Sequence, residues 1–227
     1  MLSMSFIKEN YYMIIYAVTL FISLTTYRKY YDTALKYFPI IIAYTFFNEI
    51  LGYLVRTNEE ISFFQNVEYS NFNDVIYNIY AVIFFCFFYF VYRQLVHNPR
   101  YKKWIVISTV ISLLAYLISS IFQNPIETNL YYALAISSWL LVFCVILYFR
   151  DKVQQQEDLF QKHNLMFWVS IALLVFYSIF PVLYVTGYTN YETWVKYELK
   201  SVLRVLIVIM YSLFIFGFLK ARRLAFR

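Results

Sequence analysis

The sequence predicts an all-α, polytopic membrane protein with seven transmembrane helices, built as a single domain over residues 1–227. Two observations lead to this fold class. Of the 227 residues, 62% are hydrophobic and only 14% are charged, whereas soluble globular proteins carry about 25% charged residues. The charges also lie in short segments between apolar runs that are long enough to cross a hydrocarbon core of about 30 Å as helices.

Seven apolar runs supply the predicted spans, and none shows the period-two alternation of a membrane β-barrel. Helices are expected because a lipid-exposed backbone must pair its own polar groups. The spans are Tyr11–Tyr27, Tyr37–Val55, Val75–Tyr92, Trp104–Phe122, Leu130–Phe149, Leu165–Val185 and Val202–Leu219. The chain has only 3 Gly residues, so close helix approach through small residues is mostly unavailable and aromatic packing is expected instead.

The basic residues predict the orientation of the chain. Of the 19 Lys and Arg residues, fourteen lie after the first, third, fifth and seventh spans, and four lie in the other connections. Because basic connections stay in the cytoplasm, the N-terminus is expected outside and the C-terminus inside a bacterial inner membrane. The fourteen are Arg28, Lys29, Lys36, Arg93, Arg100, Lys102, Lys103, Arg150, Lys152, Lys162, Lys220, Arg222, Arg223 and Arg227, and the four are Lys8, Arg56, Lys196 and Lys200.

Two charged side chains fall inside the predicted spans, Glu49 in the second and Arg204 in the seventh. A charge inside a bilayer is costly and marks a functional hypothesis. With a rise of about 1.5 Å per residue, both lie in the outer third of the membrane at similar depth. We therefore expect either a Glu49–Arg204 ion pair, acting as a structural staple or as part of a ligand site or switch, or an Arg204 side chain that reaches to the outer interface.

Other polar side chains lie at the same level as Glu49. Thr45, Glu49 and Tyr53 share one face of the second span at i, i+4 spacing, and Asn48 precedes Glu49. Asn78 lies about one turn into the third span, where it either joins two helices by a hydrogen bond or contacts a ligand. Together with Arg204, these residues form the predicted ligand-binding or switch site, above an inner half that is mostly apolar.

Several membrane chemistries lack their motifs in this sequence. There is no His-Glu-x-x-His helix, both histidines lie in connections, and no Lys lies mid-span in the last helix, as a retinal protein would need. One intramembrane carboxylate is fewer than a proton-coupled carrier usually has. The sequence therefore predicts no catalytic residue, no metal, no cofactor and no direct nucleic-acid partner, and we expect a protein that is not an enzyme.

The entry to the sixth span, 159-LFQKHNLMFWVSIALLVFY-177, resembles a motif of small seven-helix proteins from Gram-negative bacteria. Those proteins are encoded beside, or fused to, sensor histidine kinases. Phe167 and Trp168 match the motif, whereas Leu165, Ala172 and Phe176 stand where it has Pro, Gly and Tyr. The resemblance implies a sensory module without established catalytic residues.

Three functional hypotheses follow. The first is a sensor or receptor-like module that uses the outer-half polar site and signals to a cytosolic protein partner at the basic inner loops. The second is a pore-forming or accessory membrane effector that oligomerises, as in antiphage systems, and the third is a small-solute carrier. The lipid bilayer is a partner in all three, and the oligomeric state stays open.

Overall fold

The computed structural model describes residues 4–57, 73–126, 128–155 and 163–223, and this part of the chain is helical with no strand. Each of the seven predicted spans is a helix, as expected. A short additional helix, α7, was not predicted. The elements are α1 (Met4–Thr25), the 3-10 helix η1 (Tyr27–Lys29), α2 (Phe38–Thr57), α3 (Asn73–Leu95), α4 (Pro99–Phe122), α5 (Tyr131–Gln154), α6 (Leu165–Thr189), α7 (Tyr191–Lys196) and α8 (Leu199–Lys220).

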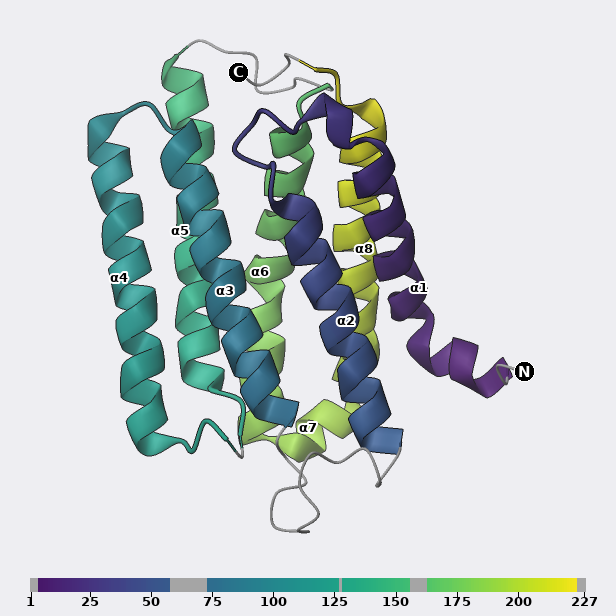
Figure 1. Cartoon of the computed structure of the whole chain (residues 1–227). Helices are drawn as coiled ribbons and strands as arrows, with labels where there is room; N and C mark the ends of the chain where they lie inside the picture. Colours follow the sequence, from purple (N-terminus) through teal and green to yellow (C-terminus); the bar gives the residue numbers. More distant parts are fainter. Residues whose placement is uncertain (1–3, 58–72, 127, 156–162, 224–227) are drawn as a thin grey trace.

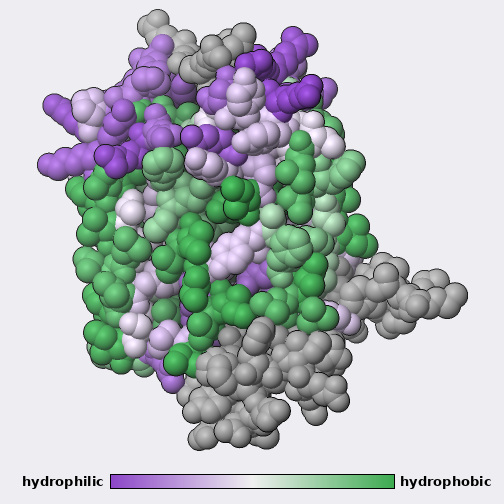
Figure 2. Space-filling view, viewed as in Figure 1, coloured by the Kyte–Doolittle hydropathy of each residue, from purple (hydrophilic) through white to green (hydrophobic). Residues whose placement is uncertain are grey.

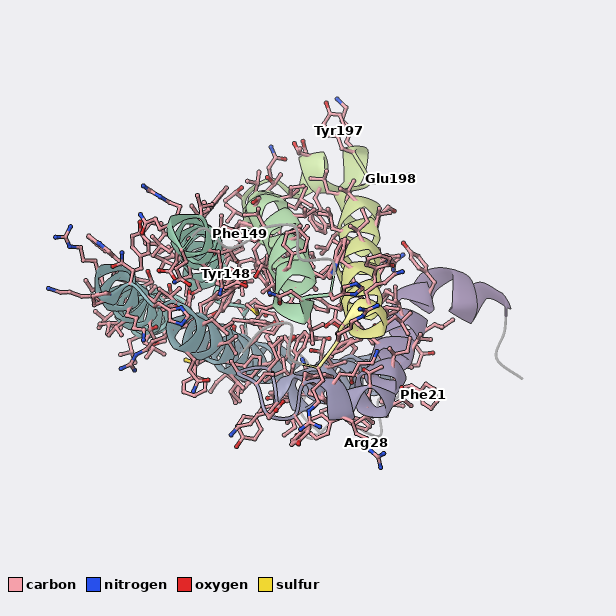
Figure 3. The ribbon with its side chains drawn as sticks, turned by 90° about the horizontal axis from the view of Figure 1, so that it is seen from above. Phe21, Arg28, Tyr148, Phe149, Tyr197 and Glu198 are labelled. Carbon is pink, nitrogen blue, oxygen red and sulfur yellow. The ribbon has the colours of Figure 1, made fainter. Side chains whose placement is uncertain are left out.

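The helices have the length and surface of a helical membrane protein. Within the described residues, α3, α4, α5, α6 and α8 are long and apolar enough to cross a bilayer, and α1 and α2 carry the shorter apolar stretches Tyr11–Thr25 and Phe38–Leu54. Figure 2 shows apolar side chains over the middle of the bundle, beneath a polar end. Large apolar side chains face outward, such as Phe21, which is 68% exposed (Figure 3). So extensive an apolar surface fits contact with lipid.

The two ends of the bundle differ in which connections they carry. The connections α1–α2 and α3–α4, the end of α5, the start of α6 and the end of α8 lie together at what we call the C-terminal end (Figure 1). The opposite end carries α7 and is called the α7 end. The Lys8, Arg56, Lys162 and Arg227 side chains, which entered the orientation argument, lie outside the described residues.

Local sequence signals explain where several helices begin. Asn98 caps α4 by accepting a hydrogen bond from the Arg100 amide, with Pro99 in the first helical turn. Asn164 caps α6 in the same way, accepting from the amides of Met166 and Phe167. Such caps satisfy amide groups that the helix itself leaves without acceptors.

Six of the helices form a closed ring. Around it, α1 packs on α2, α2 on α3, α3 on α5, α5 on α6, α6 on α8, and α8 on α1. The remaining long helix, α4, lies outside the ring against α3 and α5, as the view along the bundle shows (Figure 3). Among the described helices, the backbones of α2 and α8 do not approach each other closely, and neither do those of α3 and α6. The ring therefore has an interior that side chains must fill.

Four phenylalanines fill this interior toward the C-terminal end, and we call them the phenylalanine plug: Phe38, Phe88, Phe214 and Phe218. All are at most 1% exposed. The Phe38 ring centroid lies 5.7 Å from that of Phe88, 5.1 Å from Phe214 and 5.6 Å from Phe218. Pairs at such distances pack favourably, so the plug joins the neighbouring helices α2 and α3 to α8, whose backbone does not approach either of them closely.

A close helix approach at a glycine lies between α6 and α8. A Cβ atom placed on Gly217 would lie 2.9 Å from Cβ of Trp168 and 3.1 Å from Cδ1 of Leu165. Only a residue without a side chain fits this crossing. The expected scarcity of such contacts thus has an exception at the α6–α8 pair.

Asp151 is a buried carboxylate that the predicted boundaries missed, because the fifth span was expected to end at Phe149 whereas α5 continues to Gln154. Asp151 is 1% exposed. Its two oxygens accept from the backbone amides of His97 and Asn98 at 2.8 and 2.9 Å. The carboxylate therefore fastens the α3–α4 connection to α5.

We predict that Asp151→Ala lowers stability by about 2–3 kcal/mol, because two buried amides lose a charged acceptor. The measurement is the thermal unfolding midpoint of the purified protein in detergent. Glu192→Ala removes an exposed carboxylate on α7 and serves as the control. Equal midpoints for the two variants would contradict the role given to Asp151.

Candidate functional site

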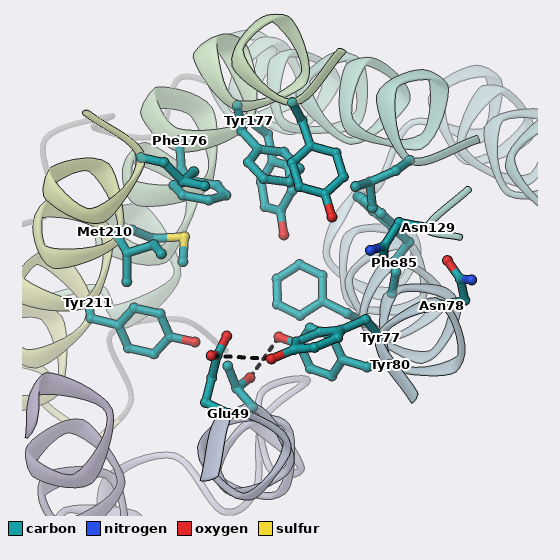
Figure 4. Close-up of a pocket in the computed structure, with 18 of the residues that line it drawn as sticks. Glu49, Tyr77, Asn78, Tyr80, Phe85, Asn129, Phe176, Tyr177, Met210 and Tyr211 are labelled. Atoms are coloured by element: carbon teal, nitrogen blue, oxygen red, sulfur yellow. Dashed lines mark hydrogen bonds between the residues drawn. The ribbon is translucent and has the colours of Figure 1, made fainter. Parts of the chain in front are cut away.

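A cavity of ≈ 200 Å³ lies inside the ring, on the α7 side of the phenylalanine plug. Its lining comes from α1, α2, α3, α6 and α8, with additional residues from the start of α5 and the connection before it (Figure 4). The cavity lies between α2 and α8, whose backbones do not approach each other closely. We call it the Glu49 cavity. Its lining is Tyr16, Thr45, Glu49, Tyr77, Asn78, Tyr80, Ala81, Phe84, Phe85, Asn129, Leu134, Phe176, Tyr177, Phe180, Tyr184, Leu203, Ile207, Met210 and Tyr211.

Thr45 and Tyr80 form a fixed hydrogen-bonded pair in the cavity wall. The Thr45 hydroxyl donates to the Ile41 carbonyl at 2.9 Å, and it lies 2.7 Å from the Tyr80 hydroxyl. Because Thr45 has one hydroxyl proton and uses it on Ile41, Tyr80 is the donor to Thr45. This chain fixes the Tyr80 ring, which also meets Tyr44 edge-on at 5.3 Å.

Glu49 lies one turn along α2 from Thr45 and points its carboxylate into the cavity (Figure 4). The Tyr77 hydroxyl donates to Oε2 of Glu49 at 3.4 Å, which is long for a hydroxyl–oxygen bond. From α8, the Tyr211 hydroxyl faces the same carboxylate (Figure 4). Among the described lining residues, Glu49 is the one with a formal charge.

Aromatic rings make up most of the remaining wall. From α6, the Tyr177 ring lies 5.7 Å from Phe84 and 5.5 Å from Phe85, both on α3. On the opposite side, Tyr16 meets Tyr211 edge-on at 4.4 Å. These contacts pair α3 with α6 and α1 with α8, so the rings bridge helices that surround the cavity. The cavity combines one carboxylate with rings and hydroxyl groups.

Asn78 borders the cavity but has a structural task. Its side-chain amide donates to the carbonyls of Pro125 and Thr128 at 2.9 and 3.0 Å. Its oxygen accepts from the Leu130 amide at 3.0 Å. Asn78 therefore holds the α4–α5 connection against α3, which is a variant of the helix-joining hydrogen bond that the sequence predicted.

Asn48 and Tyr53 lie outside the cavity lining. Asn48 is 4% exposed, and its side-chain oxygen has no hydrogen-bond partner among the described residues. Tyr53 lies on α2 one turn beyond Glu49, toward the α7 end, and is half-buried. Of the six predicted site residues, Thr45, Glu49 and Asn78 line the cavity.

Arg204 and Glu49 do not form the expected ion pair. Between described side chains, the ion pairs are His97–Asp151 and Arg223–Asp32. The Arg204 guanidinium lies 5.9 Å from the ring centroid of Tyr12 on α1. The physical reason is the ring order: α1 packs on both α2 and α8, and the cavity separates these two helices. The predicted adjacency of the two helices is therefore not found in the ring.

Tyr16, Tyr80 and Tyr211 were not among the predicted site residues. The chain has 25 Tyr residues, and tyrosines near span ends are typical of membrane interfaces. These three lie well inside their helices, at a distance from the ends where interfacial tyrosines are expected. That mid-span position is the signal that could have identified them.

The lining has no arrangement typical of a metal site or of nucleophilic catalysis. In the described part of the chain, no three His, Cys, Asp or Glu residues gather closely enough to hold a metal ion. The lining itself contains no His, Lys or Cys that could act as a base or nucleophile beside Glu49. What the arrangement offers is binding: a negative charge, hydroxyl donors and aromatic faces around one space.

We predict that Asn78→Ala speeds amide exchange around Leu130, since that amide loses its acceptor, and lowers stability by about 2–3 kcal/mol. Hydrogen–deuterium exchange of the peptide covering 128–134 measures the local effect. Ser120→Ala, which removes a hydroxyl bonded only within α4, is the control. An unchanged amide exchange rate in Asn78→Ala would contradict the role of Asn78 in holding the α4–α5 connection against α3.

For Glu49 and Arg204, we predict a coupling energy below about 0.5 kcal/mol in a double-mutant cycle of Glu49→Gln and Arg204→Gln, as for residues without contact. Unfolding in detergent supplies the four stabilities. A cycle of Ser112→Ala and Ser137→Ala, whose hydroxyls lie 2.6 Å apart, provides a positive control. A coupling energy of about 1 kcal/mol or more, on the scale of directly contacting residues, would instead indicate that Glu49 and Arg204 form an ion pair.

No protein-family model, curated protein or solved structure matches the chain. The resemblance carried by Phe167 and Trp168 to the kinase-associated proteins therefore stays a prediction. The function has to be argued from the Glu49 cavity and the helices around it.

Proposed function

We propose that all seven long helices cross a bacterial inner membrane, with the α7 end outside and the C-terminal end in the cytoplasm. The polar end in Figure 2 supports this orientation. It carries basic side chains from three connections and the end of α8, among them Lys29, Lys36, Arg100, Lys152 and Arg222. Basic residues collect on the cytoplasmic side of membrane proteins, where anionic lipids attract them.

Within this membrane, the protein acts as a receptor-like sensor, not as an enzyme, and binds a small molecule in the Glu49 cavity. One observation carries this proposal: the cavity lies on one side of the ring interior, and the phenylalanine plug fills the other. A space that is closed toward the cytoplasm can hold a ligand but does not conduct one. Small-molecule sites are typically concave, mostly apolar and equipped with a few directed polar groups.

Helix α8 provides the path from the cavity to the cytoplasm. It lines the cavity with Tyr211 and enters the plug with Phe214. Beyond the plug, Lys29 donates to the carbonyls of Phe218 and Leu219 at 3.3 and 3.1 Å. The His163 Nδ1 atom lies 3.0 Å from the Lys220 carbonyl oxygen. The end of α8 is thus bonded to two cytoplasmic connections, where a protein partner would detect its displacement.

The alternatives receive less support from this arrangement. A pore through one copy of the chain would need a continuous polar path, and the plug interrupts it. A carrier would need the plug to open toward the cytoplasm in a second state. Both therefore require a large rearrangement of buried aromatic rings, whereas a sensor needs only a shift between two helix arrangements.

We predict that compounds which stabilise the purified protein bind in the Glu49 cavity. A panel of small cationic, neutral and anionic compounds is screened by thermal unfolding in dodecyl maltoside. Ala81→Phe and Leu203→Phe fill the cavity from α3 and α8 and are expected to abolish stabilisation. Val110→Phe, a change of similar size on the exposed face of α4, is expected to leave it intact.

A second readout tests the sensor itself. Spin labels at positions 100 and 222, on the C-terminal end, report whether a stabilising compound changes the distance between α4 and the end of α8. A change is expected, and it should be lost in Ala81→Phe. If no compound stabilises the protein, or if hits bind the cavity-filled variants equally well, the proposed function is wrong. Ion or solute flux in liposomes would instead support a pore or carrier.

A further inference from the structure

The charge inside the Glu49 cavity restricts what can occupy it. Glu49 is the charged residue of the described lining. It is half-buried, so aromatic rings replace part of the water around its carboxylate. A cation beside it regains Coulomb energy that a neutral occupant cannot supply. An anion would add repulsion. At the edge of the cavity, the lining residue Asn129 donates to a second carboxylate, Asp74, so negative charge also lies at the α7 side.

The aromatic walls favour the same sign of charge. The faces of Tyr and Phe rings are negative and attract ammonium groups within about 6 Å, and aromatic cages are a common way to recognise quaternary ammonium. Here rings reach the cavity from four helices: Tyr16, Tyr80, Phe85, Tyr177 and Tyr211. In Figure 4 the rings of Tyr80, Phe85, Tyr177 and Tyr211 surround the space that the Glu49 carboxylate enters. Carboxylate and rings thus act on one occupant from several sides.

The volume limits the size of this occupant. A protein cavity of about 150 Å³ holds benzene, and the Glu49 cavity measures ≈ 200 Å³. An occupant of roughly six to eight non-hydrogen atoms therefore fits, by comparison with benzene. Choline and benzylamine are of this size.

We propose that the ligand is a small organic ammonium ion, an inference that rests on the proposed function. Its charge lies between the Glu49 carboxylate and the rings of Tyr80, Tyr177 and Tyr211, and its apolar part lies against Phe84 and Phe85. The hydroxyls of Tyr77 and Tyr80 hold the site in place, Tyr77 on Glu49 and Tyr80 on Thr45.

Pairs of compounds with the same shape and different charge test the proposal. Choline is compared with 3,3-dimethylbutan-1-ol, in which carbon replaces the charged nitrogen, and benzylamine with benzyl alcohol. Binding is measured by calorimetry and thermal stabilisation in dodecyl maltoside, which carries no ammonium group. We expect at least one cation of the pairs to bind at least about tenfold more tightly than its neutral partner, a difference of about 1.4 kcal/mol.

Two substitutions separate the contributions of charge and rings. Glu49→Gln keeps the shape of the side chain and should reduce cation affinity to that of the neutral partner, whose own affinity stays unchanged. Tyr211→Leu should weaken the cation by about fivefold, consistent with one lost cation–π contact of about 1 kcal/mol, whereas Tyr211→Phe should retain most of the affinity.

The outcomes distinguish this inference from the proposed function. If neutral or anionic compounds of the panel bind in the cavity and the ammonium ions do not, the proposed receptor function is retained and the proposal of a cationic ligand is wrong. Equal binding of charged and neutral partners, or an unchanged cation affinity in Glu49→Gln, likewise contradicts only the proposal of a cationic ligand. If no compound binds at all, both proposals fall. Should Glu49→Gln not fold, the comparison of shape-matched compounds still decides.

Discussion

The size of the aromatic side chains inside the ring is the constraint on which this structure depends. Helices in membranes approach closely where small residues line the contact, and Gly217 provides such a contact between α6 and α8. Across the interior of the helix ring, aromatic side chains of Phe and Tyr keep the backbone of α2 apart from that of α8, and the backbone of α3 apart from that of α6. Where four phenylalanines meet, the resulting gap is filled; where Glu49 and Tyr211 face each other, it stays open. The cavity is therefore a consequence of how the bundle is held apart.

Polar side chains in this bundle divide by position into two groups. Asn78, Asp151 and Lys29 lie near the helix ends. Asn78 and Asp151 form hydrogen bonds with backbone groups of neighbouring connections, and Lys29 forms them with the last carbonyls of α8. They stabilise the fold because backbone groups at helix ends and turns would otherwise lack partners. Thr45 and Glu49 lie within a helix and turn toward the interior. Asn78 also borders the cavity, but its amide group is already used to hold a connection, whereas the Glu49 carboxylate points into the space that an occupant would fill.

Helix positions could be predicted from the sequence because apolar length reports directly on membrane crossing. The shared face of Thr45 and Glu49 could be predicted too, since i, i+4 spacing is local. Adjacency around the ring could not. α1 packs on the helices of both Glu49 and Arg204, and the Arg204 guanidinium lies over the Tyr12 ring of α1. The role of Tyr211 could not be predicted for the same reason, because it depends on which helices face one another. Asp151 was missed because α5 ends a few residues later than the sequence predicted.

The order of features along α8 links the two proposals physically. Within one helix, Leu203 to Tyr211 border the cavity, Phe214 and Phe218 belong to the plug, and the final carbonyls accept from Lys29 and lie at His163. A helix is stiff along its axis. A cation that draws Tyr211 toward Glu49 would therefore also displace Phe214 and Phe218, which belong to the phenylalanine plug. The plug is tightly packed, and packed interiors change between discrete arrangements and do not deform smoothly. Ligand charge would thereby be converted into a choice between two positions of the α8 end, which is the form of signal that a cytosolic partner can read.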